Sequence, residues 1–450
     1  MALLGFDSPL VAAVAGFALL FPTAPSGPAA PDPTVTAAAP DAAVTRRLCA
    51  PPARPDRFSC HAMALVPASG AARSNAPKVQ GHGPAQLRSA YQLPDRARAR
   101  GTTVAVVVAY DLPTVEQDLK VYRAHFNLPA CTSANGCFTK LDQRGGRRYP
   151  PPDPDWGAEA ALDTQMVSAS CPDCRILLVE ADEPSHEDLG QAIDTAVKAG
   201  ADIVSNSWGG VEQGTYQKEW ERRHLDRPGI PITFSTGDSG FGSVFPASSR
   251  YVTAVGGTRL AAGANGRWVE TAWELAGSGC SGYSVKPSWQ RDDGCSRRSM
   301  ADVSAVADPA TGVAVYLSYQ SNGWAVFGGT SAAAPLIAGV YGLAHRGRSS
   351  GYPSRYPYTV PGALNDIRAG GGKGCRPLYL CRARPGYDGP TGLGSPRGLA
   401  AFTPPGTVAE GADRPTKNVQ RQLLTLPPID PGPTMDRRNK RAGNGPLPPA

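Results

Sequence analysis

Residues 104–108 read Val-Ala-Val-Val-Val, a continuous apolar run that is typical of a strand buried on both faces of a sheet. Strand and helix patterns alternate along the chain after it. Helices are expected over 115–126, 187–198 and 216–225, and further strands over 175–180, 202–207 and 230–236. This alternation predicts an α/β fold in which helices cover both faces of a mostly parallel sheet.

The composition fits a chain with a large core. Of its 450 residues, 41% are hydrophobic and 18% are charged, which excludes disorder throughout. The net charge of +7 comes from 45 basic and 38 acidic residues without a dense basic stripe, so we expect no binding to nucleic acid. We expect a linker and short N-terminal region over 31–100, one α/β domain over 101–403, and a Pro-rich tail without core-forming pattern over 404–450.

Ten cysteines indicate an oxidising compartment. Each lies near a neighbour in the sequence, and an even set at short spacings predicts five local disulfides. The expected pairs are Cys49–Cys60, Cys131–Cys137, Cys171–Cys174, Cys280–Cys295 and Cys375–Cys381. Zinc is the alternative for Cys171-Pro-Asp-Cys174, but the sequence offers no second pair of ligands at metal-site spacing.

The N-terminus carries an apolar run of twelve residues, from Leu10 to Phe21. This run is too short to span a bilayer and has the length of a signal-peptide core, so residues 1–30 are expected to be a signal segment. No Lys or Arg precedes the run, and no clean cleavage site follows it. Together with the cysteines, it predicts a secreted protein without an integral membrane segment in the mature chain.

The strongest local signal for function is Gly328-Gly329-Thr330-Ser331-Ala332-Ala333-Ala334-Pro335, where a serine after a glycine pair opens an Ala-rich apolar helix that runs to about Ala344. Glycine allows a sharp turn and close approach of the backbone, and a helix N-terminus favours negative charge near the hydroxyl. A serine nucleophile is often presented in this way. A Ser/Thr N-cap on a buried helix is the alternative.

Two acids four residues apart stand out in Trp156-Gly-Ala-Glu159-Ala-Ala-Leu-Asp163, which leads into a helix that ends near Cys171. At this spacing both carboxylates project from one helical face. Two acids on an apolar stretch repel each other unless they share a proton, which raises one pKa. A solvated helix face is the alternative. The six histidines lie in no motif that suggests a catalytic base.

In a third segment, Phe234-Ser-Thr-Gly-Asp238-Ser239-Gly240, an apolar strand ends in a Gly-flanked Asp. Such an Asp is usually a turn residue, but if it faces Ser331 its protonated carboxyl can donate to a developing oxyanion. Gly-Asp-Ser-Gly also surrounds the nucleophile of chymotrypsin-like proteases, with Ser239 in that position here. The parallel-sheet pattern and the lack of a plausible His partner argue against that alternative.

Together these segments resemble the sedolisin family, which are serine-carboxyl peptidases. The similarity extends from Gly81-His82-Gly83-Pro84 to Phe402 and includes Ser205-Asn206-Ser207-Trp208-Gly209 and the stretch from Phe245 to Thr258. The resemblance implies a subtilisin-like three-layer sandwich, with a mostly parallel central sheet and helices on both faces.

The resemblance also implies a role for each of four side chains. Ser331 is the expected nucleophile, Glu159 the general base and Asp163 the residue that orients Glu159, while Asp238 polarises the scissile carbonyl in the oxyanion hole. A carboxylate base works only where it is ionised while Asp238 is still protonated, so activity is expected at acidic pH.

The family carries a calcium site near its C-terminus, and the same layout is present here. The resemblance implies one Ca²⁺ ion held by the carboxylates of Asp366 and Asp388 and by the backbone carbonyls of Ile367, Arg384 and Gly386. Calcium prefers such an all-oxygen shell. Arg384 stands where the family usually has Gly, although only its carbonyl is needed. A structural loop without an ion is the alternative.

Two features depart from relatives of this kind. Sedolisins usually carry a long folded pro-domain, whereas fewer than 100 residues precede the similar region here, so we do not expect activation by removal of a full pro-domain. The subtilisin-type Asp at the end of the first strand is missing, since Val108 and Ala109 occupy that stretch and Asp111 lies beyond it. Sedolisins place their acid on the helix instead, so this feature fits the resemblance and counts against an ordinary subtilisin.

The sequence therefore predicts a secreted, monomeric serine-carboxyl endopeptidase that acts on protein or peptide substrates. A non-catalytic secreted binding protein on a peptidase-derived scaffold is the alternative. The presence of all four expected catalytic side chains disfavours it, because a site that has lost its activity has no physical need for them.

Overall fold

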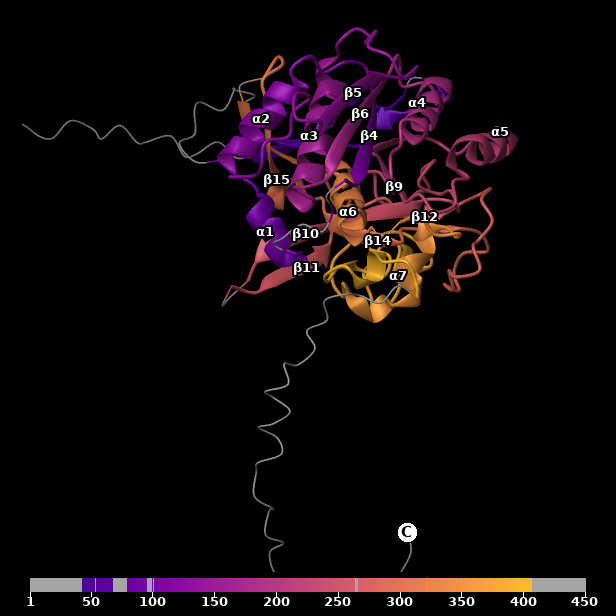
Figure 1. Cartoon of the computed structure of the whole chain (residues 1–450). Helices are drawn as coiled ribbons and strands as arrows, with labels where there is room; N and C mark the ends of the chain where they lie inside the picture. The colour runs from indigo at the N-terminus through magenta and orange to yellow at the C-terminus, as the bar shows by residue number, and fades with distance from the viewer. Residues whose placement is uncertain are drawn as a thin grey trace, which may run out of the picture. The chain divides into compact units, whose positions relative to one another are not determined.

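The apolar run of residues 104–108 forms the middle of β4 (Thr103–Ala109), and β4 lies in the centre of the main sheet. The computed structural model describes residues 43–52, 54–67, 79–94, 99, 101–263, 266–321, 323–345 and 347–406. The expected signal segment and nearly all of the expected tail lie outside these residues. Figure 1 shows the main sheet with its helices.

The main sheet has the strand order β11-β10-β9-β7-β4-β6-β5, with β14 also paired to β10. Its other strands are β5 (Phe138–Asp142), β6 (Arg175–Ala181), β7 (Ile203–Asn206), β9 (Ile232–Ser235), β10 (Thr253–Ala262), β11 (Trp268–Ala272) and β14 (Val303–Val306). Within the described strands every pair is parallel except β10 with β11. The predicted mostly parallel sheet is confirmed.

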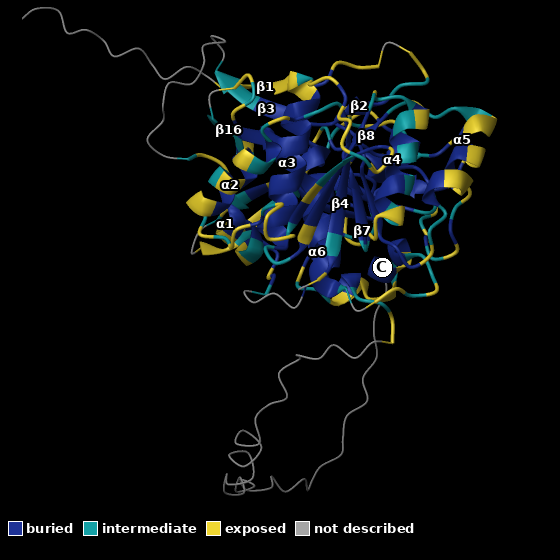
Figure 2. Ribbon diagram, turned by 45° about the horizontal axis from the view of Figure 1, so that its top comes forward, coloured by how far each residue is buried: buried dark blue, intermediate teal, exposed yellow. Residues whose placement is uncertain are grey.

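Helices cover both faces of this sheet. The helices α1 (Pro84–Ala90), α2 (Val115–His125), α3 (Pro154–Ser170) and α6 (Thr330–Ala344) pack together, and α4 (His186–Lys198) packs against β4 and β6 from the other side. The expected helix over 216–225 is α5 (Gly214–Trp220) followed by a π-helical turn. The exposed α5 contrasts with the buried α3 and α6 in Figure 2.

The start of α3 and its contact with α6 follow from local sequence. Asp153 caps α3, since its side chain accepts hydrogen bonds from the N–H groups of Asp155 and Trp156, and Pro154 occupies the first turn. A β-carbon at Gly339 of α6 would lie 1.9 Å from Oγ of Ser170. The small side chains therefore let these two helices, which carry the candidate catalytic residues, approach closely.

All five predicted disulfides are confirmed, and no cysteine of the described chain is free. Cys171 and Cys174 bond to each other at 2.03 Å, which excludes the zinc alternative for that pair. None of the described helices combines the length and the apolar character needed to cross a bilayer.

The described part of residues 43–67 forms strands that the sequence analysis did not predict. In a second sheet, β1 (Ala43–Arg47) and β3 (Met63–Pro67) are joined to β16 (Gly323–Gly328) and β15 (Val313–Leu317) in the order β1-β3-β16-β15. The short β2 (Ser59–Cys60) pairs with β8 (Trp208–Gly209). The remaining short elements are β12 (Gly279–Cys280), β13 (Ser299–Met300), α7 (Tyr356–Thr359), β17 (Leu364–Asn365) and β18 (Ser395–Pro396).

Candidate active site

Ser331 lies in the first turn of α6, directly after the end of β16. Gly329 is the N-cap of this helix and has a φ of 84°, a left-handed conformation that glycine adopts without strain. The alternative that Ser331 is an N-cap is therefore wrong. Its hydroxyl donates to the backbone carbonyl of Ser207 over 3.3 Å, and its side chain is buried.

Glu159 and Asp163 lie one turn apart on α3, and both are fully buried, so the alternative of a solvated helix face is wrong. Burial raises the pKa of Glu159 well above its usual range, and the nearby charge of Asp163 raises it further, while the Ser331 hydroxyl acts in the opposite direction. Burial also raises the pKa of Asp163 to about 8. Burial therefore opposes the ionisation of both acids.

Ser207 joins the helix of the acids to the helix of the serine. Its hydroxyl donates to Oδ1 of Asp163 over 2.8 Å and also lies 3.4 Å from the carbonyl oxygen of Ser331. It stands between β7 and β8, at the carboxyl end of a central strand, where functional groups of open α/β sheets gather. The sequence analysis placed Ser207 in a family motif but gave it no role.

Asp238 follows β9 and faces the start of α6. Its Oδ1 accepts hydrogen bonds from the backbone N–H and from the hydroxyl of Thr330, both at 2.8 Å. Its Oδ2 is buried and has no hydrogen-bond partner within the described chain. Burial raises the pKa of Asp238 to about 7. A protonated Oδ2 can therefore donate to an oxygen placed beside it.

Among the described residues, the alternative nucleophile, Ser239, has no histidine as a hydrogen-bond partner. Ser239 is exposed, and its hydroxyl accepts a hydrogen bond from the Arg47 guanidinium over 3.1 Å. Asp111, near the position of the missing subtilisin-type Asp, forms an ion pair with Lys140. Neither arrangement provides a base for a serine nucleophile.

Two residues to which the sequence analysis gave no role lie at the same place. The backbone N–H of Ala62 donates to Oε2 of Glu159 over 3.0 Å. The His61 side chain is buried, with Nδ1 2.7 Å from Oγ of Ser235. No local sequence pattern indicates that His61 and Ala62 lie at the site, because tertiary contacts with residues about a hundred or more positions away place them there.

The expected calcium residues lie close together in a loop near the C-terminal end of the described chain. Burial raises the pKa of Asp388 to about 7, and the charge of nearby Asp366 contributes. The N–H of Gly386 donates to Asp366, and that of Arg384 donates to Asp388. Asp366 is also paired with the Arg368 guanidinium over 2.7 Å, a contact that an ion would replace. Ca²⁺ prefers carboxylate oxygens and would relieve the repulsion between Asp366 and Asp388, so these two side chains fit the ion. Within the described chain no three His, Cys, Asp or Glu side chains gather as metal donors.

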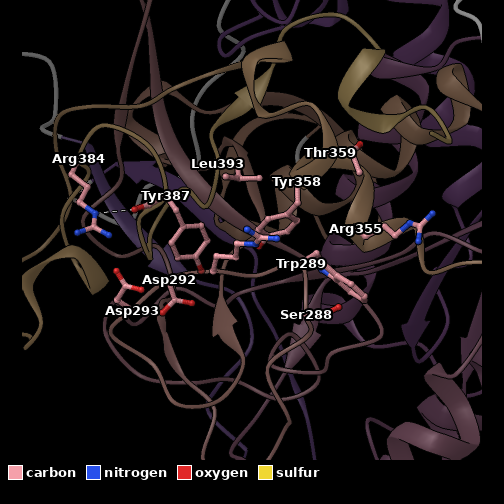
Figure 3. A pocket seen from close by; sticks show the side chains of 11 residues that line it. Ser288, Trp289, Asp292, Asp293, Arg355, Tyr358, Thr359, Arg384, Tyr387 and Leu393 are labelled. Carbon is pink, nitrogen blue, oxygen red and sulfur yellow. Dashed lines mark hydrogen bonds between the residues drawn. The ribbon is translucent and has the colours of Figure 1, made fainter. Parts of the chain in front are cut away.

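Two cavities flank these sites. One, of about 550 Å³, lies beside Asp238 and is lined in part by Arg47, His61, Gly209 and Val244. The other, of about 690 Å³, contains none of the four expected catalytic residues and adjoins the calcium loop through Arg384. Figure 3 shows this second cavity, with the hydrogen bond of 2.9 Å from Nε of Arg384 to the carbonyl of Tyr387.

Known proteins share this fold and its motifs. The sequence pattern described as the Subtilase family matches residues 157–360, a range that contains all four expected catalytic residues. Kumamolisin from Bacillus sp. (strain MN-32) is 31% identical over 369 residues, which cover 73% of this chain and 64% of kumamolisin. Tripeptidyl-peptidase 1 from Dictyostelium discoideum is 28% identical over 293 residues, which cover 53% of this chain and 46% of that relative.

Among solved structures, the chain is similar to Pseudomonas sedolisin, a serine-carboxyl proteinase solved with two molecules of pseudo-iodotyrostatin. The TM-score is 0.60 at 26% identity, with 71% of this chain and 96% of the other covered. Fold and motifs thus define a chain with the subtilisin-like α/β architecture. Within that class the chain is similar to members of the sedolisin family, as its motifs predicted. The chain spans 64% of the length of kumamolisin.

Proposed function

We propose that this chain is a secreted serine-carboxyl endopeptidase whose nucleophile is Ser331. The observation that carries the proposal is the placement of Ser331 between two groups of complementary chemistry. On one side lies the buried acid pair of α3, where the Ser331 hydroxyl acts to lower the pKa of Glu159; on the other lies Asp238, held by Thr330, whose Oδ2 has no hydrogen-bond partner among the described residues.

In the proposed mechanism, Glu159 takes the hydroxyl proton as Oγ of Ser331 attacks a peptide carbonyl. Asp163 orients Glu159 and shares its proton. The protonated Oδ2 of Asp238 and the backbone N–H of Ser331 stabilise the oxyanion of the tetrahedral intermediate. Glu159 then returns the proton to the leaving amine, and water repeats the sequence on the acyl-enzyme.

The remaining features of the proposal concern the environment of the enzyme. Five disulfides support an extracellular location, because such bonds persist in oxidising compartments. The pKa of about 7 for Asp238 supports activity on the acidic side of neutrality. Asp366 and Asp388, with the carbonyls of Ile367, Arg384 and Gly386, would hold one Ca²⁺ ion that stabilises the loop.

The test is hydrolysis of an unfolded protein substrate from acidic to neutral pH by the wild type and by Ser331→Ala. The expected loss is at least about 10⁴-fold at every pH. Ser304→Ala is the matched control, because Oγ of Ser304 is buried without a hydrogen-bond partner in the described chain, so its removal leaves no group unpaired. Turnover retained by Ser331→Ala contradicts the proposal.

One observation favours a second candidate, a non-catalytic binding protein on this scaffold. Ser331, Glu159 and Asp163 have no exposed surface, so an external substrate does not reach them in this conformation. A binding protein of this kind shows no hydrolysis at any pH, whereas the peptidase shows hydrolysis that depends on Ser331.

A further inference from the structure

The cavity of about 550 Å³ beside Asp238 lies where the proposed enzyme would receive a side chain of its substrate. Residues 209–211, here named the β8 wall, line one side of it. Residues 237–239, 243 and 244 line another side, and the whole segment 237–244, which includes Asp238, is here named the β9 wall. Residues from the stretch 47–61 complete the lining. The separation of the two named walls therefore helps to decide which substrate side chains fit.

The β9 wall consists of turns and irregular backbone. Gly237, Gly240 and Gly242 have φ values of 92°, 70° and 152°, which glycine adopts without strain. The backbone N–H groups of Gly240 and Gly242 donate to carbonyls outside the wall, those of Leu275 and Ser278, over 2.9 and 2.7 Å. The position of this wall therefore depends on its bonds to other parts of the chain.

Two connections join the walls to each other. The first is a reciprocal backbone pair, in which the N–H of Gly210 donates to Phe245 over 2.8 Å and the N–H of Phe245 donates to Gly210 over 2.9 Å. The second is Glu212, which directly follows the β8 wall, since its Oε2 accepts a hydrogen bond from the hydroxyl of Ser243 over 2.7 Å. Ser243 lines the cavity and Glu212 does not. Glu212 therefore fixes one wall to the other from outside the space that a substrate would occupy.

The Glu212 carboxylate is also held by a third segment and by the residues after the β9 wall. Its Oε2 accepts from the N–H of Gly282 over 2.8 Å, and its Oε1 accepts from the hydroxyls of Ser248, over 2.7 Å, and Ser281. The Cys280–Cys295 disulfide anchors the segment of Ser281 and Gly282. Burial alone would raise the pKa of Glu212, but these hydrogen bonds together lower it, so the carboxylate stays charged in mild acid. A charged acceptor with several donors forms a strong and fixed junction.

We propose that Glu212 is a positioning residue that keeps the β8 wall and the β9 wall at a fixed separation, so that the cavity selects substrates by the size of one side chain. The proposal rests on the proposed function of Ser331, since it concerns the substrate of that site. A cavity discriminates between side chains of different size only when its walls do not move to accommodate them. Without Glu212 the walls are joined only by the backbone pair of Gly210 and Phe245, and the cavity accommodates large and small side chains more equally.

The test uses peptides in which each residue on either side of the cleaved bond is in turn Phe or Ala. For every position, the ratio of kcat/KM between the Phe peptide and the Ala peptide measures how strongly the enzyme discriminates by size. We expect Glu212→Ala to bring this ratio at least about fivefold closer to one at a single position and to leave it unchanged at the others. A fall in activity that is equal for all peptides shows a general loss of folded enzyme and overturns the proposal.

Glu212→Gln is the conservative control. Its carbonyl oxygen can accept hydrogen bonds from Ser243 and Gly282, and its amide nitrogen can donate to the hydroxyl oxygens of Ser248 and Ser281, so the connections persist without the charge. We therefore expect Glu212→Gln to discriminate like the wild type, within about twofold.

Two serine variants form a matched pair, and they carry the test if Glu212→Ala does not fold. Ser243 and Ser248 each donate to Glu212 over 2.7 Å, but only Ser243 lines the cavity. We expect Ser243→Ala to reduce discrimination at the same position as Glu212→Ala, and Ser248→Ala to retain it. The double variant of Glu212 and Ser243 should equal Glu212→Ala, because both changes break the same connection. Effects that multiply show that Ser243 acts on the substrate by itself and overturn the proposal.

The remaining outcomes separate this proposal from the proposed function. Hydrolysis that depends on Ser331, with the same discrimination in Glu212→Ala as in the wild type, overturns the positioning role and leaves the peptidase standing. Equal effects of Ser243→Ala and Ser248→Ala on the discrimination also overturn the positioning role. Absence of hydrolysis in the wild type overturns both proposals.

Discussion

Oδ1 of Asp238 accepts two hydrogen bonds from Thr330, one from the backbone N–H and one from the hydroxyl, each over 2.8 Å. Because Thr330 immediately precedes Ser331, these bonds hold the carboxyl group of Asp238 against the turn that carries the proposed nucleophile. They also leave Oδ2 as the oxygen available to a substrate. The first two predictions follow from this relationship.

Two replacements of Asp238 distinguish the hydrogen bond that it donates to the oxyanion from the pH dependence of that donation. Burial raises the pKa of Asp238 to about 7, so the group donates below that pH and loses its proton above it. We expect Asp238→Ala to lower kcat by about 10²–10³-fold. In Asp238→Asn the amide donates at every pH, so the decline of activity toward neutral pH disappears. Profiles of kcat/KM against pH check this, and an unchanged decline in Asp238→Asn contradicts it.

The Thr330 hydroxyl affects the pKa of the Asp238 carboxyl group. Its hydrogen bond favours the charged form and therefore lowers the pKa of Asp238. In Thr330→Val that pKa rises, and the decline of activity moves to higher pH. Thr330→Ser keeps the hydroxyl and is the matched control. If activity declines at the same pH in Thr330→Val as in the wild type, and the Tm is unchanged, this role of the Thr330 hydroxyl is excluded.

Asp163 is a positioning residue for Glu159, and its replacement tests the sharing of a proton. Asp163→Asn cannot ionise, so Glu159 loses its coupled partner, and we expect kcat to fall by about 10²–10⁴-fold with a smaller change in KM. The acidic limb of the profile of kcat/KM against pH should shift as well. A purely structural effect of the substitution would lower activity without moving that limb. Ser207→Ala, which removes the hydrogen bond to Oδ1, should shift the same side of the profile to a smaller extent.

Stability should fall as the pH rises from about 4 to about 8. Burial raises the pKa of Asp238 to about 7 and those of Asp163 and Glu180 to about 8, whereas in the unfolded chain such groups titrate near 4. Between these values these three acids bind more protons in the folded state than in the unfolded state, so their contribution to the free energy of unfolding decreases with pH. The buried side chains of His61 and His186, whose pKa values are lowered to about 3 and about 4, act in the opposite direction below about pH 6.5, and the acids outnumber them. Denaturant unfolding of Ser331→Ala, which avoids self-digestion, measures the slope. Asp163→Asn in that background should flatten it, and a slope of opposite sign refutes the prediction.

Removal of calcium tests the proposed loop site without reference to activity. An ion that binds only the folded chain at a concentration one hundred times its Kd adds about 2.7 kcal/mol to the free energy of unfolding. We expect a chelator to lower the Tm of Ser331→Ala, and Asp366→Asn to abolish that response. A Tm that is indifferent to the chelator in the parent chain argues for a loop without an ion.

Much of the main sheet was predictable, because its strands and helices carry strong local patterns. The helix of Glu159 and Asp163 was expected to end near Cys171 and ends at Ser170, and the helix after Ser331 ends at Ala344 as expected. The approach of the two helices was also foreseeable from their small residues. Local chemistry and global packing agree in these segments.

The placement of residues 58–66 beside the candidate active site was not predictable in the same way. Met63–Pro67 forms a strand because β16, more than two hundred residues later, offers an edge to it, and the local sequence lacks a clear period. His61 belongs to no recognisable motif, and its position beside Asp238 depends on that pairing and on the Cys49–Cys60 disulfide. Contacts between residues so far apart in the sequence become visible only in the folded structure.

The most direct test of the central claim is the reaction of Ser331 with a peptide aldehyde carrying ¹³C at its carbonyl carbon, followed by NMR. The wild type should convert the aldehyde signal into that of a tetrahedral hemiacetal, with one equivalent bound. Ser331→Ala should give no such signal, and Ser239→Ala should give the full signal. A hemiacetal that persists in Ser331→Ala would show that another residue is the nucleophile.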